Sequence, residues 1–321
     1  MEKLDLHGKT GFIIGGTRGI GNAIAMRMAG LGMNLTVIAR KEDELAAMKA
    51  QVESLGVRFL GIQASNTDFD AIAAAFETSW QTYGRLDLLV NAAGTGVMTP
   101  FEELTKSDVD TTIDVNLKGT IYAVKLSVPY FEKTGGGNIL NISSMSAIRG
   151  IPDPVNNNGI YTATKFAING FTECMQKYLL KYGIRVTALC PGSTATSWWT
   201  RWTHSFGTDA MLPVDTLADI VELIVTSPEK VLFKQLQVLP TVEIDNFYGG
   251  NRHENCPCSG IKRREICFIR HICRHAACRG PAYRHKPHRI LPRYDNGLFP
   301  VRRCRTFRHE GLPPSARDRY L

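Results

Sequence analysis

Short apolar runs alternate with segments of helical spacing along most of the first 240 residues. The runs that we predict to be strands are residues 10–14, 34–39, 58–62, 86–90, 138–143, 184–189 and 236–239. Apolar side chains recur every three or four positions, as in amphipathic helices, over residues 22–31, 45–55, 70–83, 108–130, 161–182 and 211–225. Because parallel strands are joined by crossover helices, this alternation predicts an α/β fold with a doubly wound parallel sheet between two helix layers.

The first predicted strand leads directly into a glycine-rich turn, Gly15-Gly16-Thr17-Arg18-Gly19-Ile20-Gly21. Glycines let backbone amides approach a pyrophosphate, which then lies at the positive N-terminal end of the next helix. A strand, a glycine turn and a helix in this order favour dinucleotide binding over a turn that binds nothing. The contacts expected from this turn are Gly15, Thr17, Arg18, Gly19 and Ile20.

The second predicted strand ends in Ala39-Arg40-Lys41. A carboxylate that would bind the ribose 2′-hydroxyl of NAD is absent from these positions, whereas Arg40, Lys41 and Arg18 would attract a 2′-phosphate. We therefore expect NADP(H) rather than NAD(H) as the cofactor. The alternative is that Arg40 and Lys41 only begin a solvated loop.

A tyrosine and a lysine four residues apart, Tyr161 and Lys165, begin one of the predicted helices. Residues four apart share a helix face, so the Lys165 ammonium can lie beside the Tyr161 hydroxyl. A cation there lowers the pKa of the phenol toward the range that general acid–base catalysis needs. The spacing alone is a weak signal, because most such pairs are ordinary surface residues. The strand predicted at 138–143 strengthens it by delivering Ser144 to the sheet edge where ligands bind.

Together these features resemble the short-chain dehydrogenase/reductase family, in its form of about 250 residues with one Rossmann-like domain. The resemblance covers residues 1 to about 245 and depends on motifs that occur in the family's order. They are Gly15-x-x-x-Gly19-Ile20-Gly21, Asn91-Ala92-Ala93-Gly94, Asn116, Ser144, Tyr161-x-x-x-Lys165 and Pro191-Gly192-x-x-x-Thr196. Within the family, the chain is similar to carbonyl reductases of the 3-oxoacyl-carrier-protein reductase kind.

The resemblance implies catalytic roles for four residues. Tyr161 would protonate the substrate carbonyl oxygen as hydride arrives from the nicotinamide, and Ser144 would hydrogen-bond the same oxygen. Lys165 would lower the pKa of Tyr161 and hold the nicotinamide ribose, while Asn116 would position a water that completes a proton relay. The further cofactor contacts that the resemblance implies are Asn91, Ala92 and Gly94 after the fourth strand and Pro191, Gly192 and Thr196 after the sixth.

Three positions depart from the family's pattern. Ile14 stands where a threonine usually precedes the first glycine, so we expect one buried hydrogen bond to be missing. Ser65 stands where an acidic residue often lies near the adenine. About four additional residues separate Ser144 from Tyr161, within the asparagine-rich segment 152–159. We predict that this loop borders the substrate pocket and affects specificity without changing the proton chemistry.

Four aromatic residues, Trp198, Trp199, Trp202 and Phe206, follow the sixth predicted strand, where the family places a lid over the substrate. They would cover an apolar ketone or acyl chain and exclude water during hydride transfer. Trp198 and Trp199 are the predicted substrate contacts. Packing against a helix or a subunit contact is the alternative.

The composition changes sharply near residue 250. Residues 251–321 hold 17 of the 38 Lys and Arg but 5 of the 30 Asp and Glu, a net charge of +12 that leaves −4 for the preceding residues. Six of the eight cysteines also lie there, and Cys174 and Cys190 before them make no disulfide framework. We therefore expect an NADP(H)-binding domain over 1–245 and a basic tail over 246–321.

Three interpretations of the basic tail are open. Its scattered hydrophobic residues lack periodicity, which favours disorder or a non-native extension read in a shifted frame. The cysteines and histidines between residues 256 and 278 are zinc-ligand types, but their spacing matches no paired Cys-x-x-Cys site, and we expect no metal. A basic arm that binds nucleic acid or another polyanion is electrostatically feasible but less favoured.

The N-terminal residues are charged and lack the apolar run of a signal peptide, and no stretch reaches the about 18 apolar residues of a membrane span. We expect a cytoplasmic enzyme that acts on a small-molecule carbonyl or alcohol and forms a homodimer or homotetramer, as the family commonly does. Two other classes stay open, a cofactor-sensing binding protein without turnover and a polyanion-binding protein acting through the tail. The four intact catalytic residues argue against the sensor.

Overall fold

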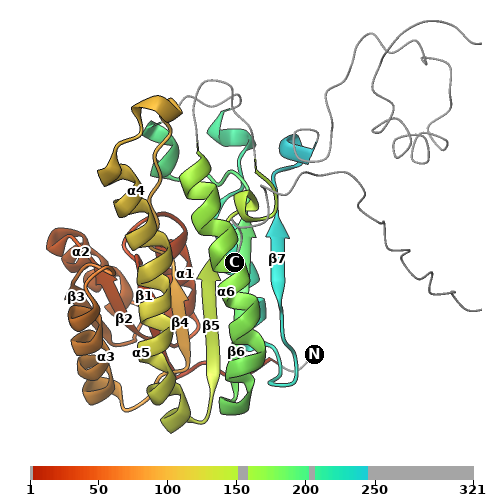
Figure 1. Ribbon diagram of the computed structural model, residues 1–321. Helices are drawn as coiled ribbons and strands as arrows, with labels where there is room; N and C mark the ends of the chain where they lie inside the picture. The colour runs from red at the N-terminus through yellow and green to blue at the C-terminus, as the bar shows by residue number, and fades with distance from the viewer. Residues whose placement is uncertain (1–2, 151–157, 202–206, 245–321) are drawn as a thin grey trace, which may run out of the picture. The chain divides into compact units, whose positions relative to one another are not determined.

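A seven-stranded parallel sheet organises the residues that the structure, a computed structural model, describes: 3–150, 158–201 and 207–244. The strand order is β3-β2-β1-β4-β5-β6-β7, so the chain winds outward from β1 to one edge and then from β4 to the other (Figure 1). The predictions for the basic tail, for Trp202 and Phe206, and for residues 152–157 lie outside the described residues. The predicted doubly wound parallel α/β fold is confirmed.

All seven predicted strands are present, with their ends displaced by at most two residues. They are β1 (Thr10–Ile14), β2 (Asn34–Ala39), β3 (Phe59–Gln63), β4 (Leu88–Asn91), β5 (Gly137–Ile142), β6 (Ile184–Pro191) and β7 (Gln235–Val238). Each pairs in parallel with its neighbours, so their carboxyl ends share one edge of the sheet.

Two helix layers cover the sheet (Figure 1). One contains α1 (Gly19–Gly30), α2 (Glu42–Glu53) and α7 (Val214–Thr226), and the other contains α3 (Phe69–Tyr83), α5 (Gly119–Thr134) and α6 (Gly159–Leu179), with α4 (Lys106–Ile113) before α5. Within the described ranges, no helix has the length and apolar character needed to cross a membrane.

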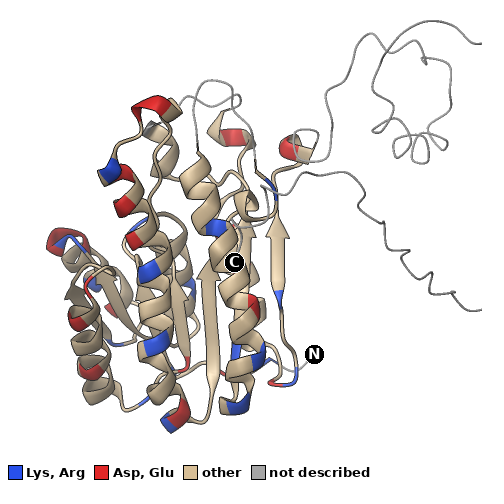
Figure 2. Ribbon diagram, in the orientation of Figure 1, with Lys and Arg blue, Asp and Glu red and all other residues tan. Residues whose placement is uncertain are grey.

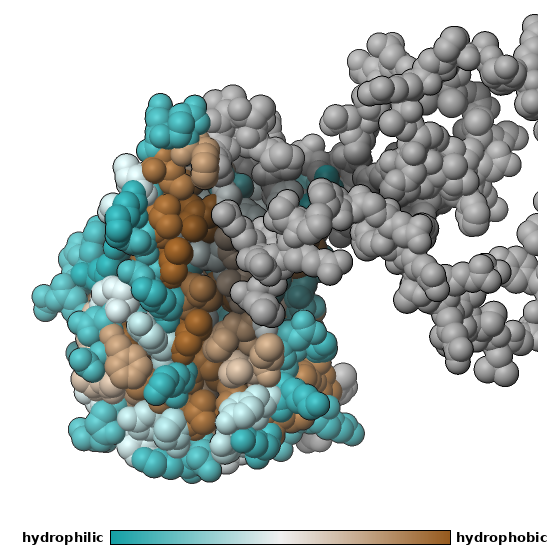
Figure 3. Space-filling view, in the orientation of Figure 1, coloured by the Kyte–Doolittle hydropathy of each residue, from teal (hydrophilic) through white to brown (hydrophobic). Residues whose placement is uncertain are grey.

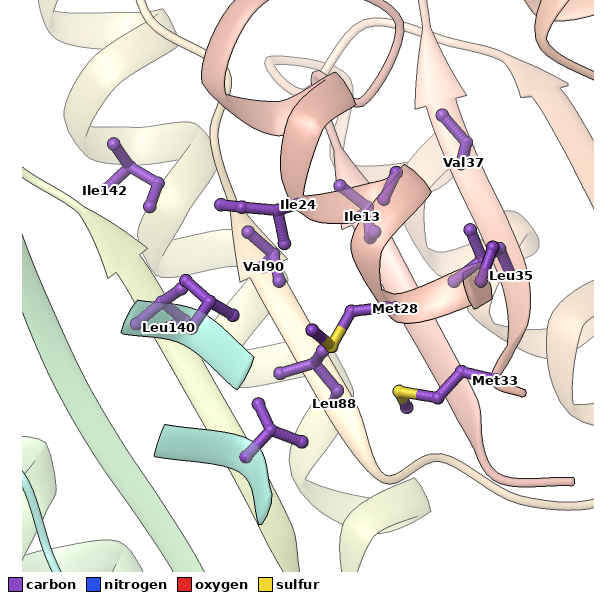
Figure 4. Packing of buried hydrophobic residues seen from close by; sticks show 14 of the residues in the cluster. Ile13, Ile24, Met28, Met33, Leu35, Val37, Leu88, Val90, Leu140 and Ile142 are labelled. Carbon is purple, nitrogen blue, oxygen red and sulfur yellow. The ribbon is translucent and has the colours of Figure 1, made fainter. Parts of the chain in front are cut away.

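The two faces of β1 explain why the strands are nearly continuous apolar runs. Ile13 packs with Ile24 of α1 in one buried cluster (Figure 4). Phe12 faces the opposite layer, where it stacks on Phe76 of α3 with ring centroids 4.0 Å apart. Ile14, which replaces the family's threonine, packs into this second cluster. Charged residues occur mostly on the helices and loops around the sheet (Figure 2), so both faces of the sheet can be packed with apolar side chains.

The continuous helix predicted over 108–130 is present, since the backbone is helical without a break from the start of α4 to the end of α5. A π-helical turn, Asp114–Lys118, joins the two helices, and the sequence did not predict it. α4 also begins earlier than predicted, because the Thr105 hydroxyl accepts a hydrogen bond from the Asp108 amide and the Asp108 carboxylate accepts one from the Thr105 amide. π-helical turns inside α-helices are frequent at functional sites, and this one contains Asn116.

Gly119 begins α5 at a close approach to the loop after β3. A Cβ at Gly119 would lie 2.1 Å from Nδ2 of Asn66. That nitrogen donates a 2.8 Å hydrogen bond to the carbonyl of Val115, inside the π turn. A side chain at Gly119 would therefore break the contact that holds the π turn against this loop.

Candidate active site

A cleft of about 810 Å³ opens at the carboxyl ends of the strands. Loops after β1, β2, β4, β5 and β6 line it together with the first turns of α6, as expected for ligand binding in such sheets. Most of the predicted site residues line this cleft: Gly15, Thr17, Arg18, Gly19, Ile20, Arg40, Ala92, Gly94, Ser144, Tyr161, Lys165, Pro191, Gly192, Thr196, Trp198 and Trp199. Asn91 and Asn116 do not contribute to its lining.

The cleft has two sides, because β1 and β4 lie between β2 and β5 in the sheet. The β2 side contains Arg18, Arg40, Lys41 and Glu44, and the β5 side contains Ser144, Tyr161 and Lys165. Neighbouring strands lie about 4.8 Å apart, so roughly 14 Å separates the two sides. That span requires an elongated ligand to reach from one side to the other.

The glycine turn after β1 has the shape of a phosphate cradle. Gly15 has a φ of +80°, and a Cβ there would lie 2.7 Å from the amide nitrogen of Ala93. Only glycine satisfies both conditions. α1 begins at Gly19, so the positive end of its dipole and its unpaired amides lie at the cleft. These residues fit the pyrophosphate of a dinucleotide.

Tyr161, Lys165 and Ser144 are brought together on the β5 side. Lys165 is only 4% exposed, and its ammonium donates a 2.8 Å hydrogen bond to the carbonyl of Ile142 at the end of β5. The same ammonium lies 5.5 Å from the centre of the Tyr161 ring. The Ser144 hydroxyl accepts a hydrogen bond from the Ser146 amide at 3.0 Å and is also hydrogen-bonded to the Tyr161 side chain. This arrangement places three polar groups around one small volume.

Burial decides the protonation of Tyr161 and Lys165. Desolvation raises the pKa of Tyr161 above its ordinary value of 10.0, and the hydrogen bond with Ser144 opposes the increase. Desolvation also lowers the pKa of Lys165 to about 8. Burial disfavours the charged form of both groups, so the net shift of the Tyr161 pKa is upward, and the lowering expected from Lys165 stays a prediction. Tyr161 keeps its proton at neutral pH and can donate it.

Asn116 lies behind the cleft and is completely buried. Its Oδ1 accepts from the Thr95 amide at 2.8 Å, and its Nδ2 donates to the Thr95 carbonyl at 2.8 Å and to the Thr164 hydroxyl at 3.0 Å. Its own carbonyl accepts from the Thr120 hydroxyl at 2.8 Å. Both amide hydrogens are thus used to join the loop after β4 to α6. The water-positioning role implied for Asn116 stays a prediction.

The side chain of Asn91 is hydrogen-bonded inside the fold and does not line the cleft. Its Nδ2 donates to Oδ1 of Asn141 at 2.8 Å, and Nδ2 of Asn141 donates to the Thr172 hydroxyl at 2.9 Å. Asn91 is 5% exposed, so this chain of hydrogen bonds links β4 to β5 and α6 inside the fold. The residues after Asn91, including Ala92 and Gly94, line the cleft, and the cofactor contact expected of Asn91 itself stays a prediction.

Sequence reasoning missed Glu44 on the β2 side. Positions 39–41 lack a carboxylate, as the sequence shows, but α2 brings the carboxylate of Glu44 into the same part of the cleft. One carboxylate oxygen accepts from the Thr17 hydroxyl at 2.8 Å and lies 3.4 Å from Nε of Arg18. The other lies 3.2 Å from the Lys41 ammonium. The spacing of three residues between Lys41 and Glu44 was the one signal of this pairing in the sequence.

A second carboxylate, Glu243, reaches the cleft from beyond β7. Its two oxygens lie 3.1 and 3.3 Å from the Ser193 amide nitrogen, so it fixes the loop after β6 that contains Gly192. A Cβ at Gly192 would lie 2.4 Å from the Glu243 carboxylate. Nothing in the local sequence indicates this contact, because it joins segments about 50 residues apart.

The two predicted lid tryptophans do different things. Trp198 faces Tyr161, with ring centroids 5.7 Å apart. Trp199 points its indole nitrogen back to the carbonyl of Thr194, to which it donates at 2.9 Å. The backbone of Gly96 packs against the rings of Tyr161 and Trp198. A Cβ at Gly96 would lie 3.1 Å from the Tyr161 ring and 3.2 Å from the Trp198 ring. Trp198 therefore covers the predicted proton donor, and Trp199 anchors the turn that carries it.

Comparisons with known proteins agree with this geometry. A profile of the short chain dehydrogenase family matches residues 9–205. An uncharacterized oxidoreductase of Staphylococcus epidermidis is 29% identical over 233 residues, which cover 72% of this chain and 97% of the relative. The match extends over nearly the whole length of that relative.

Two solved structures show the same arrangement of elements. A short chain dehydrogenase from Burkholderia cenocepacia in complex with NADP is 31% identical, with a TM-score of 0.66 over 73% of this chain and 98% of that one. The carveol dehydrogenase of Mycobacterium avium in complex with NAD is 24% identical, with a TM-score of 0.66 over 73% and 96%, and shares the fold. Since the profile spans more than half of the sequence and includes the glycine turn, Ser144, Tyr161 and Lys165, this chain belongs to the short chain dehydrogenase family of oxidoreductases.

Proposed function

We propose that this enzyme transfers hydride between NADP(H) and a carbonyl or secondary alcohol, and that it reduces an apolar ketone or 3-oxoacyl substrate. The observation that carries the proposal is the position of the Tyr161 hydroxyl beside Ser144 and Lys165, in a cleft that also contains a phosphate cradle. Asn116 completes the proposed catalytic set by fixing the loop and helix around them.

The nicotinamide, when bound, supplies the hydride that adds to the carbonyl carbon. Tyr161 gives its phenolic proton to the carbonyl oxygen, and the Ser144 hydroxyl stabilises the charge that develops there. Because the pKa of Lys165 is about 8 and that of Tyr161 lies above 10.0, returning a proton from the ammonium to the phenolate is downhill. Oxidation of an alcohol would use the same groups in reverse.

The β2 side supports NADP(H) as the preferred cofactor. Arg18, Arg40 and Lys41 line the cleft where the glycine turn and the end of β2 meet, and a 2′-phosphate is a good partner for such cations. Glu44 opposes them with one negative charge. Related proteins carry NADP in one complex and NAD in another, so direct measurement of both affinities is needed.

The β5 side supports an apolar substrate. Trp198 lies over Tyr161, and Val97 and Met98 also line the cleft. A carbonyl that reaches Tyr161 would have its apolar substituent against these side chains, which exclude water from the reacting atoms. Trp199 contributes by holding the turn that carries Trp198.

The exposed face of α5 and α6 supports a homodimer or homotetramer. An apolar band runs down this face in the space-filling view (Figure 3). Two large side chains of α6, Phe166 and Tyr178, are 45% and 56% exposed and are available for contact with a second subunit. We further propose that residues 1–245 form the catalytic domain of a cytoplasmic enzyme. Light scattering after size-exclusion chromatography tests the assembly, with Phe166→Glu expected to shift it toward the monomer.

NADPH oxidation against a panel of ketones and 3-oxoacyl thioesters tests the activity. We expect turnover with apolar members and a loss of about 100-fold to 10,000-fold in Tyr161→Phe. Tyr178→Phe, on the exposed part of the same helix, is the matched control and should retain full activity. Turnover that survives in Tyr161→Phe would contradict the mechanism, and NADPH binding without turnover across the panel would favour the sensing function.

A further inference from the structure

Glu44 makes three polar contacts on the β2 side of the cleft. The Thr17 hydroxyl donates to it at 2.8 Å, the Lys41 ammonium lies 3.2 Å away, and Nε of Arg18 lies 3.4 Å away. Its side chain is 20% exposed, whereas those of Arg18 and Lys41 are 52% and 59% exposed. The carboxylate is therefore the inner member of this cluster, and the cations are its outer members.

Glu44 stays ionised at neutral pH. Partial burial alone would raise its pKa, but hydrogen bonds from Thr17 and Lys41, together with the nearby Arg18 charge, outweigh burial and hold the pKa below its ordinary value. A full negative charge thus stands beside two of the three cations that would attract a 2′-phosphate. Arg40 is the third, and no contact of its guanidinium is present among the residues that the structure describes; only its carbonyl is used, by Gln63.

We infer that Glu44 limits the preference of this enzyme for NADP(H) by pairing with Arg18 and Lys41. The inference rests on the proposed function, in that the cleft must bind a nicotinamide dinucleotide. Glu44 repels a 2′-phosphate and competes with it for both cations, whereas an unphosphorylated ribose brings no charge to be repelled. The wild-type protein accordingly discriminates only modestly between the two cofactors, with Arg40 as the one cation free of this competition within the described residues.

The ion pairs of Glu44 contribute little to the stability of the fold, so Glu44 can be substituted without unfolding the protein. Ion pairs with half-exposed partners contribute little to folding, so Glu44→Gln should keep the fold and the amide can still accept from Thr17. Glu42→Gln is the matched control: it removes the same charge from the same helical turn, at an exposed position that does not line the cleft.

Isothermal titration with adenosine 2′,5′-bisphosphate and with AMP isolates this side of the cleft, because neither compound carries a nicotinamide. In Glu44→Gln we expect the bisphosphate to bind about fivefold to tenfold more tightly relative to AMP, and we expect the gain to shrink at high salt. Glu42→Gln should change the ratio by less than about twofold. The same shift should appear in the ratio of the NADPH and NADH dissociation constants.

Two outcomes would overturn the inference while leaving the proposed function intact. One is an unchanged ratio in a folded Glu44→Gln protein, and the other is weaker bisphosphate binding, which would mean that Glu44 orients the cations for the phosphate. A wild-type protein that binds neither AMP nor the bisphosphate would instead overturn the proposed function. Circular dichroism on each variant keeps a folding defect from being mistaken for either result.

Discussion

The two sides of the cleft differ in how far their ionisable groups are exposed to solvent. On the β5 side, Lys165 is 4% exposed and burial changes the pKa of both Lys165 and Tyr161. On the β2 side, Arg18 and Lys41 are more than half exposed, and Glu44 balances them. Desolvated groups respond strongly to their surroundings, whereas solvated charges are screened. The β5 side should therefore control rate and stability, and the β2 side should control only cofactor choice.

The largest expected effect is on the β5 side. Lys165→Met should lower the rate of carbonyl reduction at least about 100-fold, because it removes the ammonium that supplies the proton to Tyr161. In the wild-type protein kcat/KM should fall above a pH of about 8, where Lys165 loses its charge. The pH profile of the variant should lack this falling limb. If the fall in kcat/KM at high pH persists in Lys165→Met, a group other than Lys165 causes it.

Lys165 should also affect how the stability of the fold depends on pH, and in the opposite direction to its effect on the rate. The pKa of Lys165 is about 8 in the fold and 10.5 ordinarily, so the unfolded chain binds more protons between these values. The wild-type protein should therefore become more stable, as far as this group is concerned, as the pH rises from 8 to 10.5. Urea unfolding across this range should show a smaller gain in Lys165→Met, whose buried side chain carries no charge.

The second largest effect is expected at Asn116, whose buried hydrogen bonds should support both the activity and the stability of the fold. Asn116→Ala removes three side-chain hydrogen bonds and leaves the Thr95 amide unpaired, so the free energy of unfolding should fall by about 2 to 4 kcal/mol, together with the rate. Asn22→Ala, at a half-buried position of α1, should change stability by less than about 0.5 kcal/mol. A stable but inactive Asn116→Ala protein would separate the two roles.

A smaller effect is expected on the β2 side. Arg40→Ala should weaken NADPH binding about tenfold, since one charge-assisted contact with the 2′-phosphate is lost, and it should leave NADH binding unchanged. The melting temperature should stay within error of the wild type, because the side chain is exposed. Equal losses for both cofactors, or a large loss of stability, would break the distinction between the two sides.

The smallest effect is expected at Trp198, which packs against the Tyr161 ring. Trp198→Ala removes an aromatic contact of 5.7 Å with Tyr161. We expect KM for apolar carbonyls to rise about threefold to tenfold, and KM for small polar ketones to change little. Steady-state kinetics on matched substrate pairs would measure this. A uniform loss of kcat would instead show that Trp198 positions Tyr161.

Much of the site could be predicted because its residues follow strands at one sheet edge. Gly15, Ser144 and Gly192 each come directly after a buried apolar run, and parallel strands place such residues together. Asn91 has the same position relative to its strand but faces inward toward Asn141, which periodicity could not reveal. Glu44 was missed because its contacts with Thr17 and Arg18 join distant segments, and Glu243 was missed because Ser193 lies 50 residues away.

The sequence by itself determined the doubly wound sheet, the phosphate cradle and the Tyr161–Lys165 pair, because local hydrophobic patterns and spacing encode them. Only the tertiary structure decided what surrounds these groups: the desolvation that changes the pKa of Tyr161 and Lys165, the π turn that buries Asn116, and the carboxylate of Glu44 among the expected cations. Protonation and specificity depend on the dielectric environment and on charges brought in by distant segments, and neither can be read from local sequence.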